Sequence, residues 1–374
     1  MNGNIRVGNL FGIPFYINPS WFLVLALVTW TYSGGLAAQF PGLPAGVPLI
    51  LGLVTALLLF SSVLAHELGH SFVALSQGVG VNSITLFLFG GFASLDRESE
   101  TPAEAFWVAI AGPLVSLMLA GLLGITGYVT AVSGPLAAIL GLLTYINLAL
   151  ALFNLIPGLP LDGGNILKAL VWKITGNPYK AVKFASRMGQ IVGWGAIASG
   201  ILPLLLTGSF GSVWNLLIGW FLLQNAGQAA QYASVQEQLD GLTAADAVTP
   251  DSPVVSDQLS LREFADQLIL NPANWRKFLV TNATGQLVGE VAVDQLKTIP
   301  GDRWSETSVA DLTQPIESFR TVLSNQPLMD VIRLLEEKQL PALTVIRDNN
   351  ILVGLLEKPA IINLLQRRLQ ANPV

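Results

Sequence analysis

The chain contains 374 residues, of which 52% are hydrophobic and only 11% are charged. Soluble domains usually carry about 25% charged residues, so this composition excludes an ordinary soluble protein along the whole chain. The net charge of −5 is small and no basic stripe occurs, so we expect no nucleic-acid partner. Cysteine is absent from the sequence, which excludes disulfides and thiolate metal sites.

The hydrophobic residues are concentrated in residues 19–235, whereas residues 236–374 have the composition of a soluble domain. We therefore expect an α-helical polytopic membrane domain at 1–235, followed by a soluble α+β tail. The first twenty residues lack the charged start, apolar core and small-residue cleavage site of a signal peptide. We expect the first span to remain in the protein.

Six stretches approach the length of about 20 apolar residues that a helix needs to cross a bilayer. They lie at residues 20–34, 48–76, 104–131, 136–156, 187–206 and 212–232. The first stretch is short unless it includes the upstream sequence FGIPFYIN. The segment 81–96 is also apolar, but its short runs with Thr and Phe are typical of strands. We expect it to form a small membrane-associated β-sheet at the cytosolic face of the bundle, since open strand edges cannot face lipid.

The basic residues of the membrane domain all lie in the gaps on one side of the predicted spans. The gaps at 35–47, 132–135 and 207–211 contain no Lys or Arg, whereas the opposite gaps and the N-terminus contain Arg6, Arg97, Lys168, Lys173, Lys180, Lys183 and Arg187. The positive-inside rule then predicts six crossings with both termini and the tail in the cytosol. The compact size favours a prokaryotic plasma membrane, with a plastid membrane as the alternative.

The two histidines of the chain both fall in the second predicted span, in the sequence His66-Glu67-Leu68-Gly69-His70. Residues four apart share one face of a helix, so His66 and His70 can present two imidazoles to one metal ion. Glu67 lies beside them, where a general base can act on metal-bound water. The alternative is two core histidines and an ion-paired glutamate, but this span has no Lys or Arg partner, and ionisable groups within a span are costly.

A catalytic zinc ion usually takes three protein ligands, and with no other His or Cys available the third must be a carboxylate. Asp162 is the best candidate, because it follows the fourth predicted span at the same membrane level and lies in a Pro- and Gly-rich turn. The alternative is that Asp162 caps the helix expected at 165–173. Four other acidic residues lie in a charged loop and are expected to be solvated: Asp96, Glu98, Glu100 and Glu104.

The sequences HELGH at 66–70 and NLIPGLPLDG at 154–163 resemble the two signatures of the site-2 protease family, which are intramembrane zinc metalloproteases of the peptidase M50 kind. The resemblance covers residues 1 to about 232 and includes the Ala111-Gly112-Pro113 step. It implies Zn²⁺ held by His66, His70 and Asp162, with Glu67 as the base and Asn154 near the substrate or its oxyanion. Ser116 stands where the family often has Asn.

The resemblance implies an endopeptidase that cleaves transmembrane segments of membrane-anchored regulatory proteins. The substrate helix must unwind locally, because its scissile carbonyl is hydrogen-bonded within the helix, and segment 81–96 can hold the unwound strand by edge pairing. Two alternatives belong to other classes of protein. One is a transporter gated by the soluble tail, which needs polar residues from several spans. The other is a non-catalytic zinc-binding scaffold, which has no use for Glu67.

The tail contains an internal repeat, in which Gly289 and Gly354 occupy equivalent positions 65 residues apart. Each copy is predicted to contain a helix, a strand, a turn, a second strand and a helix. The repeat resembles a tandem pair of CBS modules, here at 236–300 and 301–374, which implies a regulatory or dimerising role. The family's ribose-contacting pattern is incomplete at Ala292, Glu357 and Pro359, so binding of an adenine nucleotide is the less favoured alternative.

Overall fold

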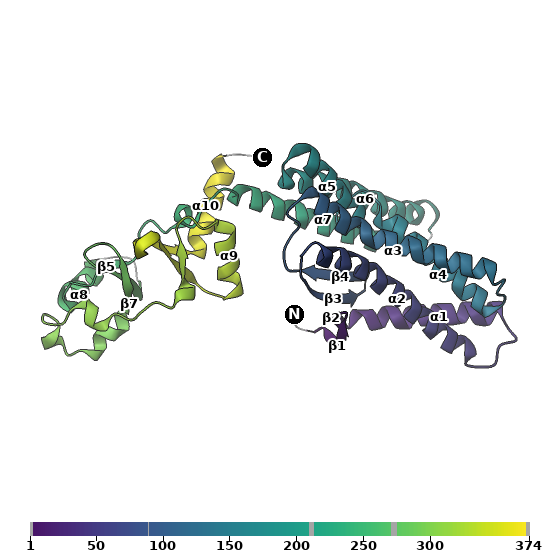
Figure 1. Ribbon diagram of the computed structural model, residues 1–374, viewed down its shortest axis with the longest axis horizontal. Coiled ribbons are helices and arrows are strands. Elements are labelled where there is room, and N and C mark those ends of the chain that lie inside the picture. Colours follow the sequence, from purple (N-terminus) through teal and green to yellow (C-terminus); the bar gives the residue numbers. More distant parts are fainter. Residues whose placement is uncertain (1–2, 89, 209–212, 271–274, 372–374) are drawn as a thin grey trace. The chain divides into compact units, whose positions relative to one another are not determined.

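The computed structural model of the protein describes residues 3–88, 90–208, 213–270 and 275–371. The chain divides into two compact units, Met1–Ala233 and Ser234–Val374 (Figure 1). In the first unit, five helices of the described residues are long and apolar enough to cross a membrane. They are α1 (Ser20–Gln39), α2 (Val47–Ser76), α3 (Pro102–Val129), α4 (Pro135–Asn154) and α6 (Pro178–Thr207).

These five helices match the first five predicted spans. Most of the sixth predicted span, 212–232, lies in α7 (Val213–Leu239), which continues without a break towards the tail. Residue 212 lies outside the described residues. The sixth crossing therefore stays a prediction.

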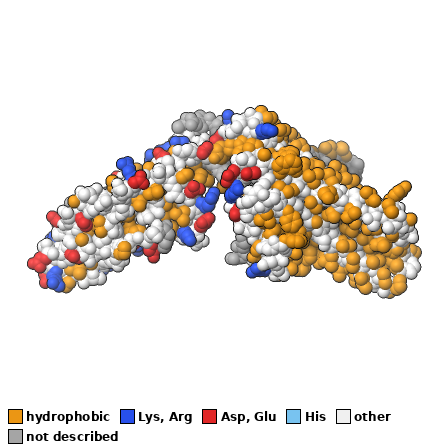
Figure 2. Space-filling model, viewed as in Figure 1, with side chains coloured by type: hydrophobic (Ala, Val, Ile, Leu, Met, Phe, Trp, Pro, Cys, Tyr) orange, Lys and Arg blue, Asp and Glu red, His pale blue; other side chains and the backbone are white. Residues whose placement is uncertain are grey.

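The surface of this first unit is largely hydrophobic, as the orange side chains in Figure 2 show. Large side chains such as Leu57, Leu122 and Leu205 are exposed on the helices. A water-soluble protein rarely exposes a continuous apolar surface of this extent. The surface fits a helix bundle whose solvent is the lipid bilayer, and the protein is accordingly an integral membrane protein.

A four-stranded sheet accompanies the helices, with the strand order β1-β2-β3-β4. The hairpin of β3 (Val81–Phe87) and β4 (Gly90–Leu95) confirms the strands predicted in segment 81–96. Two further strands, β1 (Ile5–Leu10) and β2 (Ile13–Ile17), pair with each other and were not predicted from the sequence. β2 also pairs in parallel with β3, so β4 forms one edge of the sheet.

The first span does not include the upstream sequence FGIPFYIN, because most of these residues form strand β2 and the turn before it. The side chains of Ile13 and Phe15 point into a small core with Ile84 of β3 and Trp21 of α1. Helix α1 gains its length at the other end instead, where it continues to Gln39.

Glycines allow the helices to approach one another closely. An added methyl group would lie 2.8 Å from the Thr29 carbonyl oxygen at Gly52 and 3.0 Å from the Ala111 carbonyl oxygen at Gly69. Membrane helices commonly associate by close backbone packing at small residues, because the hydrophobic effect does not drive helices together within lipid. Gly69 lies within the HELGH sequence, so the contact between α2 and α3 is tight where the histidines lie.

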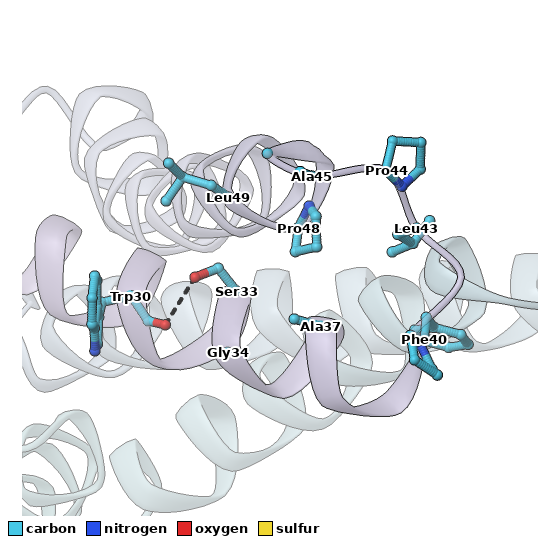
Figure 3. A pocket seen from close by; sticks show the side chains of 12 residues that line it. Trp30, Ser33, Gly34, Ala37, Phe40, Leu43, Pro44, Ala45, Pro48 and Leu49 are labelled. Carbon is cyan, nitrogen blue, oxygen red and sulfur yellow. Dashed lines mark hydrogen bonds between the residues drawn. The ribbon is translucent and has the colours of Figure 1, made fainter.

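A pocket of about 550 Å³ lies at the other end of α2, beside the loop that joins α1 to α2 (Figure 3). Trp30, Phe40, Pro44 and Pro48 contribute to its largely apolar lining. Pro48 and His66 are 18 residues apart on the same helix, which places them roughly 27 Å from each other. This pocket is therefore separate from the candidate metal centre.

The tail contains two three-stranded sheets of the same construction. In the first, β5 (Val254–Ser256) pairs in parallel with β6 (Lys277–Thr281), which pairs antiparallel with β7 (Leu287–Ala292). In the second, β8 (Thr321–Leu323), β9 (Ala342–Ile346) and β10 (Leu352–Glu357) repeat this arrangement.

A helix precedes the antiparallel hairpin in each copy, α8 (Leu261–Leu270) in the first and α9 (Leu328–Glu337) in the second. The predicted internal repeat is thus confirmed up to the second strand. After it, the copies differ, since a 3-10 helix follows β7 and helix α10 (Lys358–Ala371) follows β10. Each copy has its own core, built around Phe264 in the first and Leu328 in the second.

Candidate metal centre

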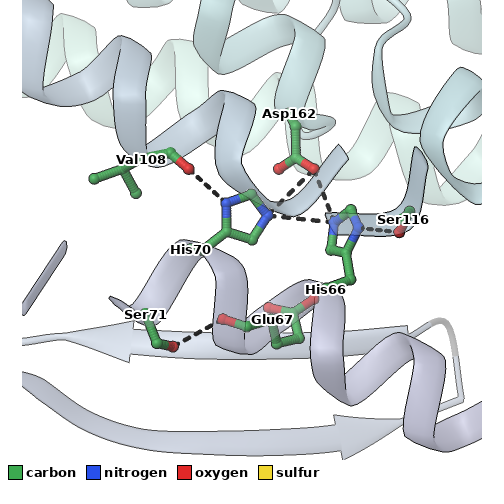
Figure 4. Close-up of polar contacts among 7 residues, drawn as sticks. All are labelled: His66, Glu67, His70, Ser71, Val108, Ser116 and Asp162. Atoms are coloured by element: carbon green, nitrogen blue, oxygen red, sulfur yellow. Dashed lines mark hydrogen bonds and ion pairs between the residues drawn. The ribbon is translucent and has the colours of Figure 1, made fainter. Parts of the chain in front are cut away.

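Helix α2 presents both histidines to one point inside the bundle (Figure 4). His66 and His70 are 3% and 9% exposed, and their Nε2 atoms are 3.3 Å apart. The spacing of four residues places both rings on one face of α2, as predicted. Two ring nitrogens this close can serve as two ligands of one metal ion.

Asp162 supplies a carboxylate to the same point from a different helix, α5 (Asp162–Thr175). Its Oδ2 atom lies 3.1 Å from His66 Nε2 and 3.3 Å from His70 Nε2. The capping alternative is not observed, because Leu161 is the N-cap residue and no side chain caps this helix. Burial opposes ionisation of the Asp162 carboxyl, but the two imidazoles beside it lower its pKa below the usual aspartate value.

The three ligand atoms fit a zinc ion. They lie within 4.8 Å of one another, with separations of 3.1–3.3 Å between the paired atoms given above. Zinc bonds of about 2.0–2.1 Å in tetrahedral geometry place neighbouring ligand atoms about 3.3 Å apart. Two imidazoles and one carboxylate are also a common set for catalytic zinc, in which a fourth position remains open for water.

Both imidazoles are oriented through their other ring nitrogen. His70 Nδ1 donates to the Val108 carbonyl oxygen at 2.6 Å, and His66 Nδ1 lies 2.9 Å from Ser116 Oγ. These partners, both on α3, direct the two Nε2 atoms towards Asp162. Second partners of this kind are typical of histidines that bind metal.

The loop 155–161 between α4 and α5 carries Asp162 into position. It is anchored by the Leu159 N–H, which donates to the Ala185 carbonyl oxygen at 3.1 Å. Gly189 of α6 lies directly against this loop, because an added methyl group would contact the Leu159 backbone and lie 3.0 Å from its nitrogen. The loop in turn packs on α5 through Gly158 and Gly164, whose backbones are in close contact. Only residues without side chains fit at this crossing.

Glu67 lies beside the histidines and against strand β4. An added methyl group at Gly91 would contact the Glu67 side chain, with its Oε1 atom 2.9 Å away. Glu67 is half-buried, and no hydrogen bond ties its carboxylate to the ligand cluster in Figure 4. The carboxylate is thus next to the ligands and next to the edge strand of the sheet.

The other acidic candidates do not join the ligand cluster. Glu100 pairs with Arg97 at 3.0 Å, and Glu104 accepts a hydrogen bond from the Glu100 backbone in the loop before α3. Asn154 is the half-buried last residue of α4, and it does not belong to the polar contacts drawn in Figure 4. Its predicted role near the substrate stays a prediction.

The roles of Gly91, Gly112 and the Ser116 hydroxyl were not predicted from the sequence. An added methyl group at Gly112 would contact His70 Nε2 and lie 2.6 Å from His66 Nε2, so this glycine keeps the space at the ligands open. The Ala-Gly-Pro step drew attention to this part of α3, but a sequence does not show which face of a helix meets the histidines.

Comparison with known proteins places the chain in a peptidase family. Residues 54–132 and 119–196 match peptidase family M50. A Synechocystis protein named as a zinc metalloprotease, sll0528, is 56% identical over 98% of this chain and 96% of its own length. Rip3 of Mycobacterium tuberculosis, also named as a zinc metalloprotease, is 32% identical over 100% of this chain and 95% of its own length.

The chain belongs to peptidase family M50. It is a zinc metalloendopeptidase of the site-2 protease type, as the sequence resemblance implied.

Two solved structures are similar to parts of the chain. The site-2 protease of Methanocaldococcus jannaschii is 30% identical, with a TM-score of 0.44, and the match covers 61% of this chain and 95% of that one. The CBS domain of a bacterial CNNM/CorC family Mg²⁺ transporter, solved in complex with ATP, is 14% identical with a TM-score of 0.29. That match covers 36% of this chain and 93% of the other.

Replacing Gly112 with alanine should weaken zinc binding. The added methyl group would crowd both Nε2 atoms, and overpacking of this kind costs about 1–3 kcal/mol, so zinc affinity should fall by roughly tenfold or more. Chelator competition on the purified protein measures this affinity. Gly121→Ala on the same helix is the control, because nothing lies within 4 Å of its added methyl group. Equal zinc affinity in the two variants would contradict the role given to Gly112.

Replacing Gly189 with alanine should displace the loop that carries Asp162. The new methyl group would meet the Leu159 backbone, which cannot move aside as a flexible side chain could. We expect a lower thermal unfolding temperature together with weaker zinc binding. Gly195→Ala on the same helix is the matched control, since its added methyl group meets open space. A Gly189→Ala protein with the control's zinc affinity would show that the loop does not depend on this contact.

Proposed function

We propose that this protein cleaves transmembrane segments of membrane-anchored regulatory proteins, with His66, His70 and Asp162 as the zinc ligands. The observation that carries the proposal is that Asp162 of α5 meets His66 and His70 of the membrane helix α2, beside Glu67. Ionisable groups within a span are rare and usually functional. Cleavage of such substrates within the membrane would make the protein an enzyme of regulated intramembrane proteolysis.

A bound zinc ion would supply an activated water molecule and polarise the scissile carbonyl. Glu67 takes a proton from the attacking water and later delivers it to the nitrogen of the leaving amine. Asp162 and the two imidazoles would hold the zinc ion beside Glu67. Asn154 is proposed to donate a hydrogen bond to the substrate oxygen as negative charge develops on it.

The substrate helix must unwind before its scissile carbonyl is accessible. Strand β4 supports a way to hold the unwound segment, because β4 is an edge of the sheet and passes Glu67 at Gly91. A peptide that adds to this edge as a further strand would be held by backbone hydrogen bonds, whatever its side chains. Its backbone would then lie next to the proposed base.

The proposed topology has six crossings, with α7 as the last, and both termini in the cytosol. Its support is the distribution of basic residues. Lys168 and Lys173 lie on α5, and Lys180 and Lys183 lie in the first turns of α6. These segments adjoin the loop that carries Asp162, so the metal centre would lie near the cytosolic side. A prokaryotic plasma membrane is the proposed location.

For the tail we propose two CBS-like modules, 236–300 and 301–374, that regulate the protease and join two copies of the chain into a homodimer. The repeated sheets support the modular division. Ala292 and Glu357 lie at the ends of β7 and β10, at positions where the ribose-contacting pattern is incomplete. A role without an adenine nucleotide is therefore the favoured one.

Replacing Glu67 with glutamine should leave zinc bound and abolish cleavage. Glutamine keeps the size of the side chain but cannot accept the proton, and loss of a general base typically costs roughly two to four orders of magnitude in rate. Zinc content and cleavage of a membrane-protein substrate in vesicles measure the two effects separately. Glu100→Gln, in the loop before α3, should behave like the unaltered protein. Cleavage by the Glu67→Gln protein at the control's rate would contradict the assignment of Glu67 as the base.

The full-length protein in detergent should have the mass of two chains. Light scattering coupled to size-exclusion chromatography measures the protein mass after subtraction of the micelle. Calorimetry of the same full-length sample with ATP and with AMP should give no binding heat at millimolar nucleotide. A mass of one chain would refute the homodimer, and a saturable heat would restore the nucleotide alternative.

A further inference from the structure

Ser116 contacts the proposed metal centre without being one of its ligands. Its hydroxyl oxygen lies 2.9 Å from His66 Nδ1, and its side chain is fully buried on α3 (Figure 4). The structure gives Ser116 no other side-chain hydrogen bond among the described residues. His66 therefore has a different partner on each ring nitrogen, Ser116 at Nδ1 and the ligand cluster at Nε2.

The packing of α3 explains why Ser116 faces His66. Gly112 lies one helical turn before Ser116 and is in close contact with the Nε2 atoms of both histidines. Residues four apart share a face, so the turn that brings Gly112 to the histidines also brings Ser116 to His66. On the other helix, Gly69 lies against the Ala111 carbonyl and keeps the two backbones close.

The two histidines have chemically different partners at Nδ1. The Val108 carbonyl can only accept, so it holds His70 with a proton on Nδ1 and a free lone pair on Nε2. The Ser116 hydroxyl can accept in the same way from His66 Nδ1–H. Without that hydroxyl, a buried N–H would lose the partner that the structure gives it, at a cost of about 1–3 kcal/mol. The imidazole would also be free to turn away from Asp162.

We propose that Ser116 is a positioning residue for zinc binding, whose hydroxyl holds the proton on His66 Nδ1 and so directs the Nε2 lone pair to the metal. The proposal rests on the metal site proposed above. The competing explanation is that a small residue is needed at this position for the packing of α3 on α2. The two explanations differ in whether the hydroxyl itself matters.

Three substitutions at position 116 separate the effect of the hydroxyl group from the effect of side-chain shape. Ser116→Ala removes the hydroxyl without adding bulk, while Ser116→Thr and Ser116→Val have nearly the same shape and differ in the hydroxyl. Ser62→Ala is the control, because Ser62 is a buried hydroxyl one turn before His66 that is bonded to Leu58 and Asn147 instead. Zinc affinity of each full-length protein is measured by chelator competition. The visible spectrum of the Co²⁺-loaded proteins serves as a second readout that reports ligand geometry.

We expect Ser116→Ala and Ser116→Val to bind zinc roughly 10- to 100-fold more weakly than the unaltered protein, as is typical when the second partner of a metal-binding histidine is lost. Ser116→Thr should bind more tightly than Ser116→Val, and the Co²⁺ spectrum should shift in Ser116→Ala but not in Ser62→Ala. The proposal is overturned if Ser116→Ala binds zinc as tightly as Ser62→Ala, or if the threonine and valine variants have equal affinity.

A His66→Ala variant distinguishes failure of this inference from failure of the metal site. Zinc binding by His66→Ala with unaltered affinity would refute the proposed ligand set itself, and the role of Ser116 with it. Loss of zinc in His66→Ala together with full affinity in Ser116→Ala would leave the ligand set intact and refute only the positioning role.

Discussion

The structure depends on one constraint, which is that polar groups at the depth of a bilayer must find their partners within the protein. Two imidazoles and a carboxylate meet inside a bundle whose outer surface is hydrophobic. Each isolated ionisable group would cost about 2.5–3.5 kcal/mol on insertion. Here each has a partner, since Asp162 contacts both rings, the Val108 carbonyl accepts from His70 Nδ1, and Ser116 Oγ lies 2.9 Å from His66 Nδ1. The contacts that bring the candidate ligands together therefore also hold α2, α3 and α5 in one register.

Glycines at close backbone contacts allow this polar centre to form. Gly112 leaves room at the ligands, Gly91 admits the Glu67 side chain to the sheet, and Gly189 lets the loop before Asp162 cross α6. In each case backbone or ligand atoms occupy the volume that a methyl group would need. The ligands come from helices distant in the sequence, and their approach within hydrogen-bonding distance requires that the backbones between them come close as well.

Much of the site could be predicted from the sequence, because its strongest signal is local. The spacing of His66 and His70 fixes a shared helix face, and the lack of other metal-binding side chains led to Asp162. The strands β1 and β2 were not predicted, because Phe11, Pro14 and Phe15 lie in an apolar run that also resembles the start of a span. Ser116 was noticed only as a departure from a family pattern. Its contact with His66 depends on the rotation and separation of two helices, which no local pattern specifies.

The pairing of β2 with β3 has a consequence for how the protein is made. Phe15 pairs with Ile84, and both predicted spans α1 and α2 lie between them. The N-terminal hairpin leaves the ribosome first, yet its partner strand emerges only after these two helices. The edge of β2 that faces β3 therefore gains this partner only after the segments of both helices have been synthesised. The sheet beside Glu67 thus joins strands from both sides of the first two membrane helices, so its four-stranded form requires that these helices return the chain to the same place.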